Sequence, residues 1–295
     1  MDTVVIGAVG YAAADAVDML GNLVEGYFVH FPFPFVRFLL LSAKIQKILR
    51  RKPMSVYTIA DLHLSHSADK PMDIFGPRWE NHTQKLFDNW QNLVRDEDTV
   101  IIAGDISWGM RTEDAVADLE FIHSLKGRKI ITKGNHDFWW QTMKKLYELR
   151  DSVGALSIDF LYNNAYAVEN FIICGTRGWF PEANYSEFDE KIVNRESERL
   201  RTSILAGKKL QEENPHSELI VFLHYPPAYG SVRCQRICEV LQEYGVKRVF
   251  YGHLHGAQKS RLIHQISGAS LTLVAADWLD FKPLLIEEDI IRTVI

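Results

Sequence analysis

From residue 54 onward, short apolar runs alternate with longer segments whose apolar residues recur at helical spacing. This alternation is typical of an α/β fold, in which strands and helices follow one another along the chain. We expect strands at residues 55–60, 99–103, 129–132, 171–174, 219–223, 248–251, 271–274 and 283–286. We expect helices at residues 78–94, 113–125, 138–149, 191–213 and 232–244, and an irregular insertion at residues 175–194.

Five of the expected strands are followed by acidic, amide or imidazole side chains, always on the C-terminal side. The residues concerned are Asp61, His63, Asp105, Asn135, His136, Asp137, His224, His253 and His255. In α/β sheets, the carboxyl edge of the strands is where ligands bind. Histidines with independent structural roles would not gather at that edge, so the pattern indicates one functional site.

The spacing and chemistry of these side chains favour a metal site. Asp61 and His63 are two residues apart, as are His253 and His255, so on an extended backbone each pair would project to one side. Glycines precede three of the site residues and permit tight turns that bring the backbone close to an ion. Carboxylate, amide and imidazole ligands without cysteine suit divalent Mn, Fe or Zn, and seven candidate ligands suit two ions.

The ordered motifs D-x-H, G-D, G-N-H-D, H and G-H-x-H lie between residues 54 and 256 and resemble those of the calcineurin-like metallophosphoesterase superfamily. The segments DLHLSHSADKPMDIFG, GDISWGM and GNHDFWW further resemble a bacterial branch of predicted phosphohydrolases. The resemblance implies an α/β fold, built as a β-sandwich flanked by helices, with a metal site at the C-terminal ends of the strands. It also implies a metal-dependent phosphoester hydrolase, a mono- or diesterase, in which a hydroxide activated by two metal ions attacks phosphorus in line.

Carried over by position, the resemblance implies one metal ion held by Asp61, His63, Asp105 and His255. It implies a second ion held by Asp105, Asn135, His224 and His253, with Asp105 bridging the two. His136 is then the unligated catalytic histidine, which stabilises the transition state or protonates the leaving oxygen. Asp137 is open to two interpretations, an orienting partner of His136 or the cap of the helix at residues 138–149.

Three further residues that follow strand ends are candidates for substrate binding. Arg177 could clamp a phosphate through two parallel hydrogen bonds, and Arg111 and Trp108 lie around the expected mouth of the site. The other aromatic residues in these regions, for which core packing is the commoner role, are Trp139, Trp140, Trp179 and Tyr225. His66 is expected to be a solvated loop histidine rather than an extra ligand. The expected partner is a phosphorylated small molecule or nucleotide.

Charge and cysteine content narrow the alternatives. Residues 1–53 carry a net charge of +2, so residues 54–295 carry −7 of the total of −5, which argues against a nucleic-acid partner. The three cysteines are too few and too scattered for a disulfide framework, which favours a cytoplasmic location. Two alternative functions remain: a peripheral-membrane nucleotide-lipid pyrophosphohydrolase, and a non-catalytic scaffold. A scaffold would be expected to have lost ligands, and every motif residue is present.

The first 53 residues form a leader outside the family pattern, so we expect a leader at residues 1–53 and a metallophosphoesterase domain at residues 54–295. Residues 35–52 combine apolar positions near helical spacing with lysine and arginine. Three interpretations of the leader remain open. It contacts an anionic membrane surface, it packs on the domain or is mobile, or the natural start is Met54.

Overall fold

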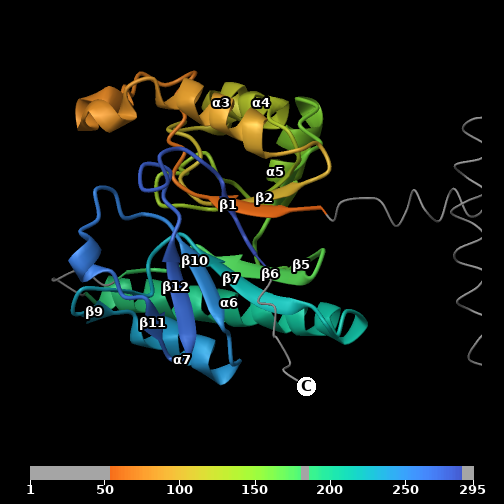
Figure 1. The fold of residues 1–295 in the computed structure, drawn as a ribbon, viewed down its shortest axis with the longest axis vertical. Helices are drawn as coiled ribbons and strands as arrows, with labels where there is room; N and C mark the ends of the chain where they lie inside the picture. The colour runs from red at the N-terminus through yellow and green to blue at the C-terminus, as the bar shows by residue number, and fades with distance from the viewer. Residues whose placement is uncertain (1–53, 181–185, 288–295) are drawn as a thin grey trace, which may run out of the picture. The chain divides into compact units, whose positions relative to one another are not determined.

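The computed structural model describes residues 54–180 and 186–287, which form two β-sheets that face each other (Figure 1). The first sheet has the order β13-β1-β2-β3-β4, with bounds Leu284–Leu285, Val56–Ile59, Thr99–Ala103, Arg128–Thr132 and Ile158–Phe160. The second has the order β11-β12-β10-β7-β6-β5, with bounds Gln265–Ile266, Ala269–Leu273, Arg248–Tyr251, Glu218–Leu223, Phe171–Thr176 and Tyr166–Val168. A separate hairpin pairs β8 (Ala228–Tyr229) with β9 (Val232–Arg233).

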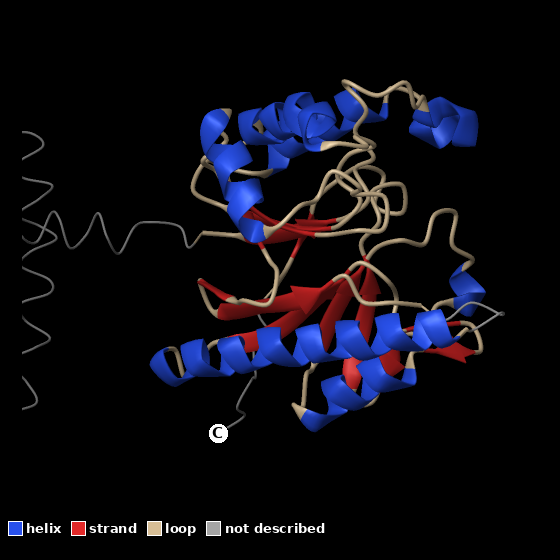
Figure 2. Ribbon diagram, turned by 180° about the vertical axis from the view of Figure 1, so that it is seen from behind, coloured by secondary structure: helices blue, strands red, loops and turns tan. Residues whose placement is uncertain are grey.

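Helices cover the outer face of each sheet (Figure 2). The first sheet carries α3 (His82–Leu93), α4 (Val116–Ser124) and α5 (Met143–Ser152), and the second carries α6 (Glu187–Glu213) and α7 (Gln235–Glu243). Short 3₁₀ helices are η1 (Met72–Phe75), η2 (Pro77–Trp79), η3 (Thr112–Ala115) and η4 (Lys259–Arg261). The α/β sandwich flanked by helices, which the sequence implied, is confirmed.

The central strands are mostly apolar because both of their faces are buried. In β2, Val100 and Ile102 pack in the layer that contains the helices, whereas Ile101 and Ala103 pack in the layer between the sheets. Phe222 of β7 belongs to the same inter-sheet layer. Strands covered on both faces read as continuous apolar runs rather than as alternating patterns.

Parallel pairing brings the carboxyl ends of the central strands together. Strands β1, β2 and β3 run parallel in the first sheet, as do β6, β7, β10 and β12 in the second. The two sheets also meet at these ends. The Ala60 amide donates to the Val274 carbonyl at 2.8 Å, and the Ala276 amide donates to the Ala60 carbonyl at 2.9 Å. Loops from both sheets therefore converge on one place.

One expected helix begins later than its sequence suggested. Residues 138–142 are not helical, and α5 starts at Met143 with Thr142 as its N-cap. The Asp137 carboxylate is not this cap, because it accepts hydrogen bonds from other loops. The expectation that Asp137 caps the helix at 138–149 is therefore wrong.

The irregular insertion expected at residues 175–194 is wrong at both ends, whereas residues 177–180 are irregular as expected and residues 181–185 lie outside the described residues. Strand β6 continues to Thr176, and α6 begins at Glu187. Ser186 and Asp189 form a capping box there, which satisfies free amides of the first helical turn. The remaining differences are short elements, including β4, β5 and β11, whose two or three residues leave little periodicity to detect.

The leader, including residues 35–52, lies outside the described residues, so its proposed roles stay predictions. None of the helices formed by residues 54–180 and 186–287 has the length and apolar character needed to cross a membrane. The three cysteines are buried as free thiols.

Candidate metal centre

Just after strands β1, β2 and β10, the backbone adopts the left-handed conformation at four of the expected ligands. The φ angles are 58° at Asp61, 47° at His63, 51° at Asp105 and 70° at His253. The expectation that Asp61 and His63, or His253 and His255, project from an extended backbone is therefore wrong. Non-glycine residues with such angles cost roughly 1–2 kcal/mol each and persist where surrounding contacts enforce them. Here the Asp61 amide donates to the backbone carbonyl of Gly104 at 2.9 Å, and the His63 amide donates to the backbone carbonyl of Asp105 at 3.0 Å.

The glycines of the motifs make room for carboxylates. A Cβ atom at Gly134 would lie 2.0 Å from Oδ1 of Asp105, and one at Gly252 would lie 2.3 Å from Oδ2 of Asp61. Either contact is far inside van der Waals distance. These positions are closed to any larger residue because each acidic side chain packs directly on the glycine backbone.

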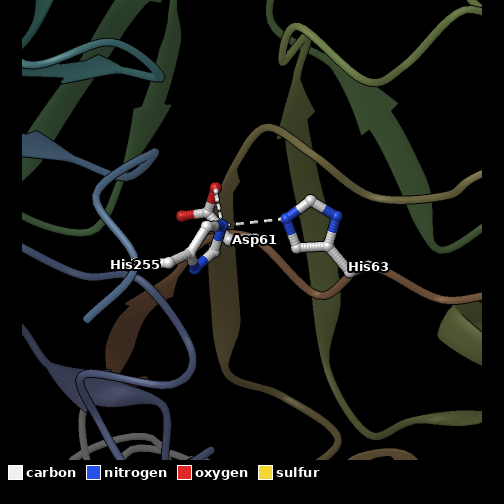
Figure 3. A group of neighbouring side chains, drawn as sticks. All are labelled: Asp61, His63 and His255. Carbon is white, nitrogen blue, oxygen red and sulfur yellow. Dashed lines mark hydrogen bonds and ion pairs between the residues drawn. The ribbon is translucent and has the colours of Figure 1, made fainter. Parts of the chain in front are cut away.

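A first group of donors consists of Asp61, His63 and His255, which converge from β1 and β10 (Figure 3). Nε2 of His63 lies 3.0 Å from Nε2 of His255, which in turn lies 3.9 Å from Oδ1 of Asp61. The Asp61 carboxylate also accepts the backbone amide of His253 at 2.9 and 3.0 Å. Two ring nitrogens and a carboxylate oxygen therefore face a common point.

A second group lies on the other side of the same cluster. Oδ1 of Asn135 is 2.6 Å from Nε2 of His224 and 2.9 Å from Nδ1 of His253. The Asp105 carboxylate links the groups, since its Oδ2 lies 3.7 Å from Nε2 of His63 and 3.4 Å from Nε2 of His224. The structure thus brings all seven expected ligands together, four from loops of the first sheet and three from loops of the second.

Partners behind two of the rings direct their nitrogens toward the cluster. Nδ1 of His224 lies 3.2 Å from the Ala103 carbonyl, and Nδ1 of His255 lies 3.0 Å from Oδ1 of Asp277. Because Nδ1 donates in each ring, Nε2 keeps a lone pair for a ligand. Asp277 also accepts the Gly256 amide at 3.1 Å.

Asp277 was missed by the sequence analysis. It follows β12 by a few residues, as the other acidic site residues follow their strands. The expected strand at residues 271–274 is followed by Asp277, so the same pattern of a polar residue after a strand was present there. Its role depends on His255, which lies far away in the sequence and close in the fold.

Burial makes the ionised forms of these side chains costly. It raises the pKa of Asp61 well above its ordinary range and that of Asp105 to about 6. It lowers the pKa of His224 to about 3 and that of His253 to about 2. Divalent cations would neutralise the carboxylates and accept the lone pairs of the neutral imidazoles. This mixed set of oxygen and nitrogen donors therefore fits divalent cations.

His136 stands beside the donor groups without joining them. Its ring nitrogens hydrogen-bond to no other residue in the described part of the chain, and its ring centroid lies 4.4 Å from that of Trp108. Its backbone amide donates to Oδ1 of Asp105 at 2.8 Å. Burial lowers the pKa of His136, and the charge of Asp105 opposes that shift.

Asp137 holds the loops after β2 and β3 together. Its buried carboxylate accepts amides of Asp105 at 3.0 Å, Ile106 at 2.9 Å and Gly134 at 2.7 Å. It also accepts the indole N–H of Trp139 at 3.0 Å. Asp137 therefore fixes the backbone at Asp105 rather than contacting the His136 ring.

A cavity of about 750 Å³ adjoins the first donor group. His63, His136 and His255 line its floor, and Met72, Phe75, Trp79, Trp108 and Trp278 make most of its walls apolar. Trp108 stacks on His63 at 4.9 Å between ring centroids, so this expected substrate residue lies in the cavity. Arg78 and Lys259 are its cationic residues.

The other expected substrate residues lie elsewhere. Arg111 is 76% exposed, pairs with Asp114 at 3.1 Å and does not line this cavity. Arg177 lies 3.7 Å from Glu196 and lines a second cavity. His66 also stays outside the donor groups, because its Nδ1 lies 2.7 Å from Oδ1 of Asp118.

The remaining aromatic candidates divide between core and site. Trp139 and Trp140 are buried in the core of the first sheet and its helices. The Trp179 ring packs on Tyr225 at 5.1 Å between centroids, and Tyr225 packs on His253 at 4.3 Å. These two rings therefore support the second donor group.

Two curated proteins are similar to this chain in sequence. The gene 66 protein of Mycobacterium phage L5 is 29% identical over 170 residues, which cover 56% of this chain and 79% of the phage protein. An uncharacterised protein of Methanocaldococcus jannaschii is 30% identical over 87 residues, covering 28% of this chain and 46% of that protein.

Two solved structures were also found to be similar. A protein of unknown function from Aquifex aeolicus has a TM-score of 0.44 and 16% identity, covering 79% of this chain and 95% of that one. The phosphopantetheinyl hydrolase of Mycobacterium tuberculosis has a TM-score of 0.45 and 13% identity, covering 80% of this chain and 97% of that one.

The family model described as calcineurin-like phosphoesterase matches residues 54–257, which include every donor of both groups. That family implies metal-dependent hydrolysis of phosphoester bonds. With more than half of its length matched, the chain belongs to the calcineurin-like phosphoesterase family.

Proposed function

We propose that this chain hydrolyses phosphoesters at a centre of two divalent cations. The observation that carries the proposal is the position of Asp105. One oxygen of its carboxylate, Oδ2, faces Nε2 of His63 at 3.7 Å and Nε2 of His224 at 3.4 Å. A single oxygen that faces a nitrogen donor of each group is what a bridging ligand requires.

The ligands divide around that oxygen. Besides Asp105, one cation would be held by Asp61, His63 and His255, and the other by Asn135, His224 and His253. Bound there, the cations supply positive charge to the phosphate oxygens and lower the pKa of water. The hydrogen bonds behind His224 and His255 keep the Nε2 atoms of both rings directed inward.

His136 supplies the proton-transfer group. It lines the large cavity next to the first donor group, and its ring nitrogens are free of hydrogen bonds to other described residues. A phosphate at the centre would therefore meet an available imidazole, which can donate a proton to the leaving oxygen. The Trp108 ring, packed at 4.4 Å, limits the orientations open to His136.

Metal content and turnover test the bridge. In the full chain loaded with Mn²⁺, Asp105→Asn should lower occupancy of both sites and abolish turnover, whereas His63→Asn should mainly weaken one site. Asp96→Asn is the matched control, because Asp96 is an exposed acid outside the cluster. Elemental analysis gives the metal content, and a panel of phosphomonoesters, phosphodiesters and cyclic nucleotides gives the activity. Full metal content in purified Asp105→Asn protein would contradict the proposal.

A second candidate is hydrolysis of a nucleotide-lipid pyrophosphate. The observation that favours it is the apolar character of the 750 Å³ cavity, whose aromatic walls include Trp79 and Trp278. Arg78 and Lys259 add positive charge at the same cavity. Adding nucleotide sugars and a nucleotide-linked lipid to the panel separates the candidates. A clear preference for the lipid over small esters would favour the second one.

A further inference from the structure

A second cavity, of about 550 Å³, adjoins the backbone of the second donor group. Lys133 lies on its wall, two residues before the ligand Asn135. Arg177 lies on another wall, and its carbonyl accepts the His224 amide at 3.1 Å. Among the described residues, this cavity shares no lining residue with the 750 Å³ cavity.

The charge of this cavity is strongly one-sided. Its cationic lining residues are Lys133, Arg177, Arg195 and Arg199, and Glu196 is its acidic one. The formal balance is therefore +3 in a chain whose residues from 54 to 295 carry −7. Glu196 is fully buried, and its carboxylate accepts the Thr176 hydroxyl and the Arg199 guanidinium at 2.7 Å each.

One carboxylate oxygen cannot satisfy the donors that surround it. Oε1 of Glu196 lies 2.7 Å from Arg199, 3.5 Å from Arg195 and 3.7 Å from Arg177. Each guanidinium carries five N–H donors, so most of them remain available. Nε of Arg177 is buried without a hydrogen-bond partner. The Lys133 ammonium likewise makes no hydrogen bond or ion pair to another residue in the ranges that the structure covers.

A structural role accounts for one of these cations and leaves the others unexplained. Arg199 alone pairs with the buried Glu196 at hydrogen-bond distance. One of the remaining side chains, Arg177, packs over the Trp179 ring at 5.2 Å, and Arg199 packs over the Tyr162 ring at 4.9 Å. Preorganised guanidinium groups with free donors match the oxygens of phosphate.

We propose that this cavity binds a phosphate group, separate from the phosphate that reacts at the metal centre. The group has two possible sources, a second phosphate on the substrate and free inorganic phosphate. The first source rests on the proposed function, since it assumes that a substrate reacts at the neighbouring centre. The second source does not.

Phosphate binding to the full Mn²⁺-loaded chain is the direct test. Isothermal titration with inorganic phosphate should show affinity about tenfold weaker in Arg195→Gln, because one charge-assisted hydrogen bond is lost. Lys133→Gln should weaken it to a similar extent. Lys209→Gln removes the same charge from an exposed position of the same helix α6 and should leave the affinity unchanged. Arg195 is half-exposed, so its variant should fold, which thermal melting checks.

Kinetics separate the two sources. If the substrate carries the second phosphate, Arg195→Gln should raise KM for a nucleoside 3′,5′-bisphosphate about tenfold and leave KM for p-nitrophenyl phosphate unchanged. If free phosphate is the ligand, the KM ratio of the two esters should stay constant while phosphate binding weakens. Equal phosphate affinity in the unmodified chain and both cavity variants would overturn the proposal. An inactive chain whose phosphate binding still depends on Arg195 would refute the proposed function alone.

Discussion

Replacing Asp277 by asparagine tests whether a residue outside the ligand set controls metal binding. The Asp277 side chain is 3% exposed, and its Oδ1 accepts Nδ1–H of His255 at 3.0 Å. Burial by itself would raise the pKa of Asp277, but the hydrogen bond and the charge of His255 hold it below its ordinary value. The carboxylate is therefore ionised at neutral pH. Asparagine preserves its shape and removes its charge.

The expected magnitude follows from the change in this one hydrogen bond. A hydrogen bond to a charged group contributes roughly 1.5–3 kcal/mol, and a neutral one contributes about 1 kcal/mol. A loss of about 1.4 kcal/mol corresponds to tenfold weaker metal binding, and outer partners of metal-binding histidines commonly contribute 10- to 100-fold. We therefore expect Asp277→Asn to weaken one Mn²⁺ site about tenfold.

The assay is a Mn²⁺ titration of metal-depleted protein, followed by calorimetry. Asp280→Asn is the matched control, since Asp280 is 75% exposed and lies three residues further along the chain. The control should bind like the unmodified protein. The site that does not contain His255 should keep its affinity in Asp277→Asn. Unchanged affinity at both sites would refute the argument that Asp277 positions His255.

His136→Ala should keep the full metal content while kcat falls by roughly 10²–10⁴, because the substitution removes a proton donor and leaves every metal ligand in place. Loss of metal in this variant would show that His136 is a ligand. Asp98→Asn should lower the free energy of unfolding by about 2 kcal/mol in urea at pH 7, because hydrogen bonds from Ser55 at 2.8 Å and Arg95 at 2.6 Å then lose their charged acceptor. Those hydrogen bonds outweigh burial and hold the pKa of Asp98 below 3.8. The contribution of the Asp98 carboxylate to the free energy of unfolding is therefore present above pH 3.8 and is lost as the pH falls through its folded-state pKa. A difference in unfolding free energy between Asp98→Asn and the unmodified chain that is the same at pH 3 as at pH 7 would contradict this. A chain that starts at Met54 should hydrolyse a small soluble ester with near-normal kcat and should lose any salt-sensitive binding to anionic vesicles, whereas an insoluble product would show that the leader packs on the domain.

The sequence predicted the strands that position the site because those strands are buried on both faces. The bounds of β2 and β10 agree with the expected ranges, and the polar residues after them lie in the donor cluster. A continuous apolar run of four or five residues is too short for a typical helix, so its length identifies it as a buried strand. The family motifs then ordered the ligands.

The parts that could not be predicted depend on contacts between distant segments. The left-handed backbone at Asp61 and His63 is held by the carbonyls of Gly104 and Asp105, which belong to another loop. The Asp137 carboxylate accepts amides from the loop after β2, which is why it does not cap a helix at residue 138. The left-handed backbone has no local signal, because isolated propensity favours an ordinary backbone at these positions. The late start of α5 does have one, the N-cap residue Thr142, which the sequence analysis did not use.

The convergence of both sheets on the metal centre has a consequence for stability. His63 leaves the first sheet and His255 leaves the second, and the two are 192 residues apart in the sequence. Cations bound to both would act as a cross-link between the sheets, and binding restricted to the folded chain raises its stability by mass action. The hydrogen bonds that join Ala60 to Val274 and Ala276 lie beside that cross-link. Metal depletion should therefore speed amide hydrogen exchange at Ala60 and Ala276 more than at the far ends of the same strands.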